Sequence, residues 1–120
     1  MLICDLAIKE EGTGKHSLIG IFENISARQF PARHGRLCVY AKITDAQGDY
    51  SIRLELIRLE DFAVVGEGQV SVTVEDRMAA TELVFNLGGL VFERAGRYEF
   101  RLRANGLSVG AKSFNVVQLP

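Results

Sequence analysis

Tyr50-Ser-Ile-Arg-Leu-Glu-Leu56 is the stretch that decides the fold. Its apolar side chains occupy every second position, and Ser51, Arg53 and Glu55 stand between them. Successive side chains of a β-strand point to opposite faces of the sheet, so this alternation predicts a strand with one buried and one solvated face. No segment of the chain sustains the apolar spacing of an amphipathic helix. The chain is therefore predicted to be all-β.

The same alternation recurs on both sides of this stretch. The expected inward-facing sets are Leu37, Val39, Ala41 and Ile43; Val70, Val72 and Val74; Leu83, Phe85 and Leu87; and Tyr98, Phe100, Leu102 and Ala104, while Leu2, Cys4, Leu6 and Ile8 share one parity near the start. Turn residues separate the runs, as at Asp45–Gly48 and Asn105-Gly106. About eight short strands at this spacing predict an immunoglobulin-like, two-sheet antiparallel β-sandwich of about seven to nine strands, with a small barrel as the alternative. We expect a single domain over residues 1–120.

The last predicted hairpin contains one conflict. A two-residue turn at Asn105-Gly106 with regular pairing would set Phe114 and Val116 opposite outward-facing side chains of the preceding strand. A one-residue bulge near Gly110 to Lys112 would return both apolar side chains to the core. We therefore expect such a bulge.

Composition bounds the class of protein. The chain has 120 residues, of which 48% are hydrophobic and 24% charged, as in a globular domain that folds without metal or disulfide staples. The net charge of −1 predicts neither nucleic acid nor an anionic membrane surface as partner. No apolar run approaches the ~20 residues of a membrane span. The start, Met1-Leu-Ile-Cys-Asp-Leu6, has no basic leader, so we expect no secretory signal and a cytoplasmic protein.

Two cysteines, Cys4 and Cys38, are too few and too far apart for a disulfide framework or a zinc motif. Free thiols are the expected state. The alternative is a small thiol-dependent enzyme that uses Cys38 or Cys4 with a histidine, either His16 or His34. Nothing in the sequence places either imidazole against either sulfur.

Other candidate sites are incomplete. Asp45 and Asp49 flank one loop, but a calcium site needs several convergent carboxylates. Gly12 and Gly14 precede Lys15 without the Gly-Lys-Ser/Thr motif and helix of a phosphate-binding loop, so a hairpin turn explains them. We expect no cofactor and no metal.

Arginines line the outward face of one predicted strand. Arg97, Arg101 and Arg103 could bind an acidic partner or a phosphate, but Glu99 is interleaved with them. Lys112 is expected to pair with Glu99 across the hairpin. A solvated face of mixed charge is the preferred interpretation.

A set of short motifs resembles a family of short bacterial proteins of unknown function. The matching motifs are Ile3-Cys4-Asp5, Gly14-Lys15 before Leu18-Ile-Gly-Ile-Phe22, Phe30-Pro31, Leu87-Gly-Gly-Leu90, Gly96-Arg-Tyr-Glu-Phe100 and Phe114-Asn-Val116. Together they span nearly the whole chain. The resemblance implies an immunoglobulin-like sandwich and brings no catalytic or binding residue with it.

The preferred function is a non-catalytic protein-interaction or structural accessory module. Tyr40, Ile57, Leu59 and Val84 are apolar at parities that face away from the core, and exposed apolar groups mark interaction surfaces. Either they or the arginine face would bind a protein partner, and a homodimer is the simplest expectation. The alternative for Ile57 and Leu59 is that a bulge or strand end turns them inward. A small-ligand carrier is a further alternative, although the absence of Trp and the many branched aliphatic residues favour a filled core.

Overall fold

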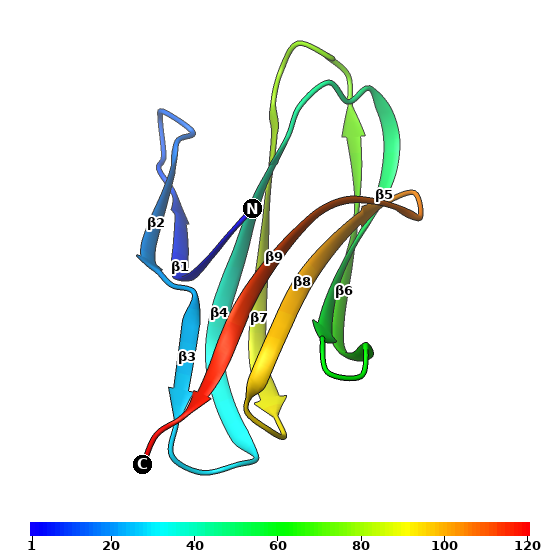
Figure 1. Ribbon diagram of the computed structural model, residues 1–120. Coiled ribbons are helices and arrows are strands. Elements are labelled where there is room, and N and C mark those ends of the chain that lie inside the picture. The colour runs from blue at the N-terminus through cyan, green and yellow to red at the C-terminus, as the bar shows by residue number, and fades with distance from the viewer.

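The computed structural model describes residues 1–120 and contains nine strands in two sheets, with no helix (Figure 1). The strands are β1 (Leu2–Lys9), β2 (His16–Ile21), β3 (Asn24–Ala27), β4 (Ala32–Ile43), β5 (Gly48–Arg58), β6 (Ala63–Val74), β7 (Thr81–Phe92), β8 (Gly96–Ala104) and β9 (Leu107–Gln118). One sheet has the order β2-β1-β4-β7, and the other, which is strongly curled, has the order β3-β9-β8-β5-β6. The predicted all-β class is confirmed. No helix long and apolar enough to cross a membrane is present.

The predicted alternation is confirmed in the strands that build the core. In β5, Ile52, Leu54 and Leu56 are almost completely buried. The core between the sheets has sixteen buried residues: Ile3, Ile25, Leu37, Val39, Ala41, Ile52, Leu54, Leu56, Leu83, Phe85, Phe92, Tyr98, Phe100, Leu102, Phe114 and Val116. Both sheets contribute to this set, so burial of apolar area holds them face to face. Val70 departs from the pattern, because edge strand β6 leaves it 40% exposed.

Aromatic rings join the two sheets at one end of the core. Phe92 of β7 meets Tyr98 of β8 edge-to-face, with ring centroids 5.0 Å apart, and Phe114 of β9 at 6.0 Å. Phe114 in turn stacks on Phe100 at 5.3 Å. Such geometries place the positive edge of one ring against the negative face of another, or offset the two faces.

The bulge predicted for the last hairpin is present, one residue before the expected range. Leu102 pairs with Gly110 but Arg103 pairs with Ser108, so Val109 is the extra residue. Phe114 and Val116 are buried as a result.

Not every strand pair is antiparallel, so that part of the prediction is wrong. β3 runs parallel to β9, with Asn24 opposite Asn115 and Ile25 opposite Val116. Only two residues separate β3 from β2, and over them the chain passes from the edge of one sheet to the edge of the other. β3 continues in the direction of β2 (Figure 1), and this direction makes it parallel to β9.

Ile57 lies at a second bulge and is buried. Between Leu56 and Ile57 the register of β5 against β6 shifts, which leaves Val65 unpaired. Ile57 stands opposite outward-facing Glu99 yet is only 4% exposed, so it does not belong to an open surface. The sequence pattern alone left both outcomes open for this residue.

Ile57→Lys is expected to lower the free energy of unfolding by at least about 3 kcal/mol, because it removes a buried aliphatic side chain and buries an ammonium group. Urea denaturation followed by circular dichroism measures the change. Leu107→Lys, at a position 73% exposed, serves as the matched control and should cost under about 0.5 kcal/mol. Equal stability of the two variants would contradict the placement of Ile57.

Candidate functional site

The β1–β2 hairpin folds back over the outer side of its own sheet. β1 pairs with β4 only from Leu2 to Cys4, and then bends away (Figure 1). From β2, the ring of His16 reaches that of Tyr40 with centroids 5.8 Å apart. Leu2, not His16, is the register partner of Tyr40, so the hairpin must reverse direction after Cys4 to bring His16 there.

A polar cluster fixes the hairpin in this place. Tyr40 on β4 donates a 2.5 Å hydrogen bond to Glu82 on β7, and His16 Nδ1 lies 2.9 Å from the same carboxylate oxygen. The contact of His16 is close but not aligned as a hydrogen bond. The bond from Tyr40 lowers the pKa of Glu82, and the pKa of Tyr40 is raised by the same bond.

This arrangement decides how much of the predicted interaction surface is open. Tyr40 and Val84 lie on the outer face of one sheet and are only partly exposed, because the hairpin leans over this face. Ile57 and Leu59 belong to the other sheet or follow it. The structure therefore does not bring the four apolar residues together.

The hairpin itself carries an exposed aliphatic face that sequence reasoning did not identify. Ile8, Ile19 and Ile21 are 44%, 50% and 55% exposed. Ile21 stands opposite Cys4 and Ile19 opposite Leu6, so these side chains share one face of the hairpin. Exposed aliphatic side chains gathered on one face are a feature that marks a protein contact.

Gly20 interrupts the free edge of β2. Its φ of 69° lies in the left-handed region, and a Cβ at this position would collide with the carboxylate of Asp5. A regular ladder with another strand cannot continue through such a residue. The face of the hairpin is thus better suited to contact than its edge.

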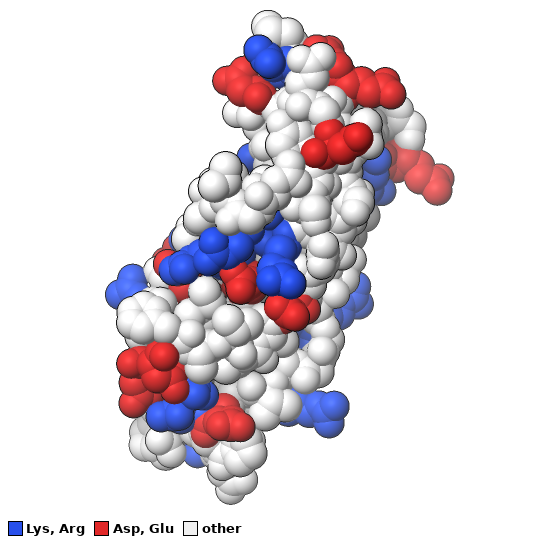
Figure 2. Space-filling model, turned by 90° about the vertical axis from the view of Figure 1, so that its right-hand side faces the viewer, with Lys and Arg blue, Asp and Glu red and all other residues white.

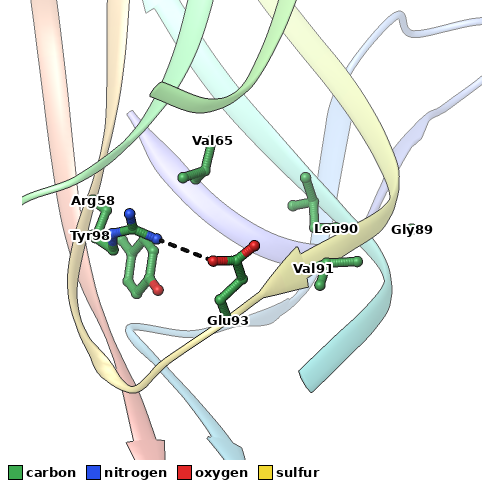
Figure 3. Close-up of a pocket in the computed structure, with 7 residues that line it drawn as sticks. All are labelled: Arg58, Val65, Gly89, Leu90, Val91, Glu93 and Tyr98. Atoms are coloured by element: carbon green, nitrogen blue, oxygen red, sulfur yellow. Dashed lines mark ion pairs between the residues drawn. The ribbon is translucent and has the colours of Figure 1, made fainter. Parts of the chain in front are cut away.

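A second candidate is a pocket of about 430 Å³ at the open side of the sandwich, between the ends of β5, β6 and β7 (Figure 3). Val65, Leu90 and Val91 form its apolar wall, and Glu93 points between them and Arg58. A cavity of this size falls within the range of small-molecule sites.

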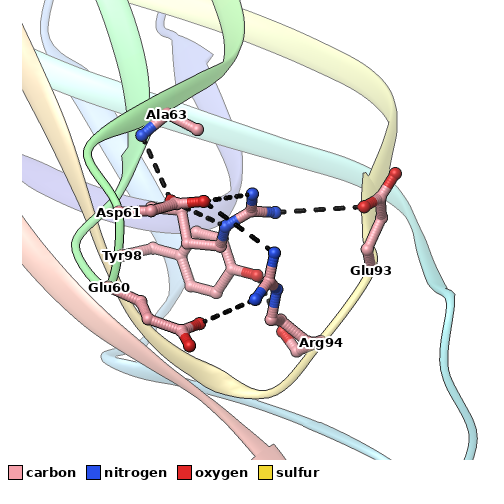
Figure 4. A network of polar contacts seen from close by, with 7 residues as sticks. Glu60, Asp61, Ala63, Glu93, Arg94 and Tyr98 are labelled. Atoms are coloured by element: carbon pink, nitrogen blue, oxygen red, sulfur yellow. Dashed lines mark hydrogen bonds and ion pairs between the residues drawn. The ribbon is translucent and has the colours of Figure 1, made fainter.

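The charged groups of this pocket are already paired (Figure 4). Arg58 donates two hydrogen bonds to Asp61, at 3.0 and 2.8 Å, and its Nη1 lies 4.0 Å from Glu93. Arg94 bonds Glu60 at 3.1 Å and lies 3.8 Å from Asp61. Arg58 is 9% exposed, and a charge at that depth needs such partners.

Tyr98 closes the pocket floor and has no free hydroxyl for catalysis. It is fully buried and donates a 2.7 Å hydrogen bond to the carbonyl of Arg94. Burial raises its pKa, so the phenol stays protonated. The pocket offers no nucleophile beside a free base, and its arginine–carboxylate network closes one end of the core.

The sequence model of one protein family, described as a family of unknown function (DUF6941), matches residues 1–117. The chain belongs to this family. The resemblance seen in the sequence motifs is confirmed at this level, and it assigns no activity. No curated protein and no solved structure matches the chain.

Two of the three arginines of the predicted arginine face form ion pairs, and Figure 2 shows basic and acidic side chains next to one another on the molecular surface. Arg101 bonds Glu99 at 2.8 Å, and Arg103 bonds Glu55 at 2.5 Å. Arg97 donates to the hydroxyl of Ser113 at 3.0 Å. The carboxylates of Glu99 and Glu55 thus pair with the guanidinium groups of Arg101 and Arg103 that would contact an acidic ligand.

The expected pair of Lys112 with Glu99 is wrong. Lys112 lies opposite Phe100 and reaches Glu23 at 2.6 Å instead. The bulge at Val109 sets this register, so the pairing follows from tertiary structure that a regular hairpin does not contain.

Neither histidine lies beside a sulfur. His16 contacts Tyr40 and Glu82, as described above, and the ring of His34 lies 6.0 Å from that of Phe22. Cys4 and Cys38 are fully buried, and burial is the main cause that raises the pKa of Cys4. A raised pKa disfavours the thiolate that a thiol enzyme needs.

The remaining sequence candidates also stay apart from any site. Asp49 accepts a 2.8 Å hydrogen bond from Thr73, and no group of three His, Cys, Asp or Glu side chains converges. A cavity of about 190 Å³ between the strand ends includes Ile43, Tyr50 and Val74 in its lining. It is smaller than the cavities that usually enclose small ligands.

Arg58 was missed at the sequence level, although a feature of the sequence could have identified it. It continues the inward parity of Leu54 and Leu56, and an arginine at an inward position requires buried partners. Asp61 stands three residues further on, within reach of a turn.

Asp61 makes the fold sensitive to acid. The bond from Arg58 lowers the pKa of Asp61 from 3.8 to about 2. The ionised carboxylate therefore makes its full contribution to the stability of the folded chain when the pH lies above the ordinary pKa of 3.8. This contribution is lost as pH falls toward about 2. We expect Asp61→Asn to have a lower melting temperature than the native chain at neutral pH, and the difference to shrink between about pH 5 and about pH 2.5. Melting temperatures of both chains against pH measure this.

Glu60→Gln is the control for this prediction, because Glu60 is an exposed neighbour bound only to Arg94. The melting temperature of Glu60→Gln should follow that of the native chain closely at every pH. A constant difference between Asp61→Asn and the native chain at every pH would contradict the assignment.

Proposed function

We propose that the protein is a non-catalytic interaction module with an immunoglobulin-like sandwich, and that two copies associate through the aliphatic face of the β1–β2 hairpin. The observation that carries the proposal is the exposure of Ile8, Ile19 and Ile21 on one face. We place the module in the cytoplasm, where the free thiols of Cys4 and Cys38 are reduced in the absence of an added oxidant.

Two features support the immunoglobulin-like assignment. The chain passes repeatedly from one sheet to the other, so that β4 and β7 belong to one sheet and β5 and β8 to the other. Tyr98, near the start of β8, bonds the carbonyl of Arg94 four residues upstream. A tyrosine that bonds backbone a few residues upstream at this corner is a hallmark of immunoglobulin-type sandwiches.

The free energy that burial of the hairpin face would contribute is in the range of a weak or moderate dimer. Full burial of an isoleucine contributes about 1.5 to 3 kcal/mol, and a half-exposed one about half of that. Three such residues from each of two copies would contribute roughly 5 to 9 kcal/mol. This amount is comparable with the estimated cost of about 4 to 15 kcal/mol for lost rigid-body freedom.

The polar groups of the molecule support a binding role over catalysis. Arg58, Arg94 and the carboxylates beside them are engaged with one another. The two thiols are covered, and neither histidine reaches them. Catalysis would need a nucleophile and a base within hydrogen-bond reach of each other in an open site.

Ile19→Lys should dissociate the dimer, because it places a charge in the middle of the hairpin face that the dimer would bury. The fold should stay intact. Sedimentation velocity at micromolar concentrations measures the association, and circular dichroism checks the fold. Leu107→Lys changes a still more exposed apolar residue at the start of β9, outside the hairpin, and should remain dimeric. A native chain that sediments as a monomer throughout would refute self-association.

A further inference from the structure

The two cysteines face each other across neighbouring strands. In the antiparallel pair of β1 and β4, Cys4 and Cys38 are register partners. Directly opposite residues in such a pair have Cα atoms about 4.5 to 5.5 Å apart, and disulfides span Cα distances of about 4.4 to 6.8 Å. The backbone register is therefore compatible with the Cα separation that a disulfide spans.

The two sulfur atoms lie in one buried environment that is closed to solvent. Both cysteines have no exposed surface, and Cys38 donates its thiol hydrogen to Asn86 Oδ1 at 2.9 Å. The carbonyl of Asp5, where β1 bends, lies 3.9 Å from the same sulfur. The pair thus sits beneath the base of the hairpin, where β1 is joined to β4 only from Leu2 to Cys4.

We propose that Cys4 and Cys38 are a modification site: a small peroxide converts them into a reversible disulfide that ties the hairpin to β4. Access requires only a local opening of the short β1–β4 ladder. The proposal goes beyond the interaction module and does not depend on it.

The chemistry balances with hydrogen peroxide as the oxidant. One thiolate attacks the peroxide, forming an S–O bond and breaking the O–O bond, which gives a sulfenic acid and, after proton transfer, water. The facing thiol then attacks this sulfur, forming the S–S bond and breaking the S–O bond, and a second water leaves. The two sulfurs lose two electrons and two protons in total, and one peroxide is reduced to two waters. Because burial raises the pKa of Cys4, the first step should accelerate as the pH rises.

The crosslink should restrain the unfolded chain more than the folded one. It would close the loop from residue 4 to residue 38, which is otherwise free in the unfolded state. We expect the melting temperature to rise by roughly 5 to 10 °C. The rise should disappear when the disulfide is reduced.

The test treats the reduced, full-length chain with hydrogen peroxide under native conditions. The expected products are a mass lower by about 2 Da, no alkylatable thiol, a peptide that links Cys4 to Cys38, and full recovery with dithiothreitol. The Ile19→Lys variant should behave identically, which separates this proposal from self-association.

Single-cysteine variants provide the control. In Cys38→Ser, the sulfenic acid of Cys4 should persist and be trapped by dimedone, and the melting temperature should not rise. In Cys4→Ser, the same should hold for the sulfenic acid of Cys38. The native-chain measurement is decisive even where a variant fails to fold. Three results would overturn the proposal: thiols unchanged at a peroxide concentration that oxidises the urea-unfolded chain, sulfinic acids without a crosslink, or a disulfide between two chains.

Discussion

The contact of Phe92 with Tyr98 and Phe114 is the constraint on which the rest of the structure depends. It joins β7 of one sheet to β8 and β9 of the other at ring distances of 5.0 and 6.0 Å. Because Tyr98 is fixed there, its hydroxyl holds the carbonyl of Arg94, and Arg58 covers the same end of the core. The arginine–carboxylate network thus has a structural role, since it satisfies a charge that the packing of this end buries.

The outer face of the four-stranded sheet is covered in part by another segment of the same chain. Cys38, Tyr40 and Val84 face away from the core, and an open apolar face would invite association. The reversal of β1 after Cys4 brings the hairpin across this face instead. The apolar surface is thereby moved outward to the isoleucines of the hairpin, with the sulfurs enclosed beneath it. Binding is consequently assigned to the exposed isoleucines of the hairpin, and oxidation to the buried cysteine at its base.

Local alternation was sufficient to predict the strands but not what covers them. Tyr50 to Leu56 shows its buried face directly, because parity along one strand is a local property. The burial of Ile57 and the partner of Lys112 depend on bulges, whose positions follow from how two distant strands pack. The bend of β1 could not be predicted either, since no residue pattern near Asp5 indicates where the hairpin will lie. The hairpin face was missed for this reason, although Ile19 and Ile21 already share parity in the sequence.

The most direct test of contact through the hairpin is an isoleucine-methyl NMR titration of the native chain against its own concentration. The buried isoleucines Ile3, Ile52 and Ile57 serve as internal references in the same spectrum. We expect the methyl signals of Ile8, Ile19 and Ile21 to shift together as concentration rises, while the signals of the three buried isoleucines stay constant. Constant signals for all three hairpin isoleucines, or shifts confined to other parts of the chain, would contradict contact through the hairpin.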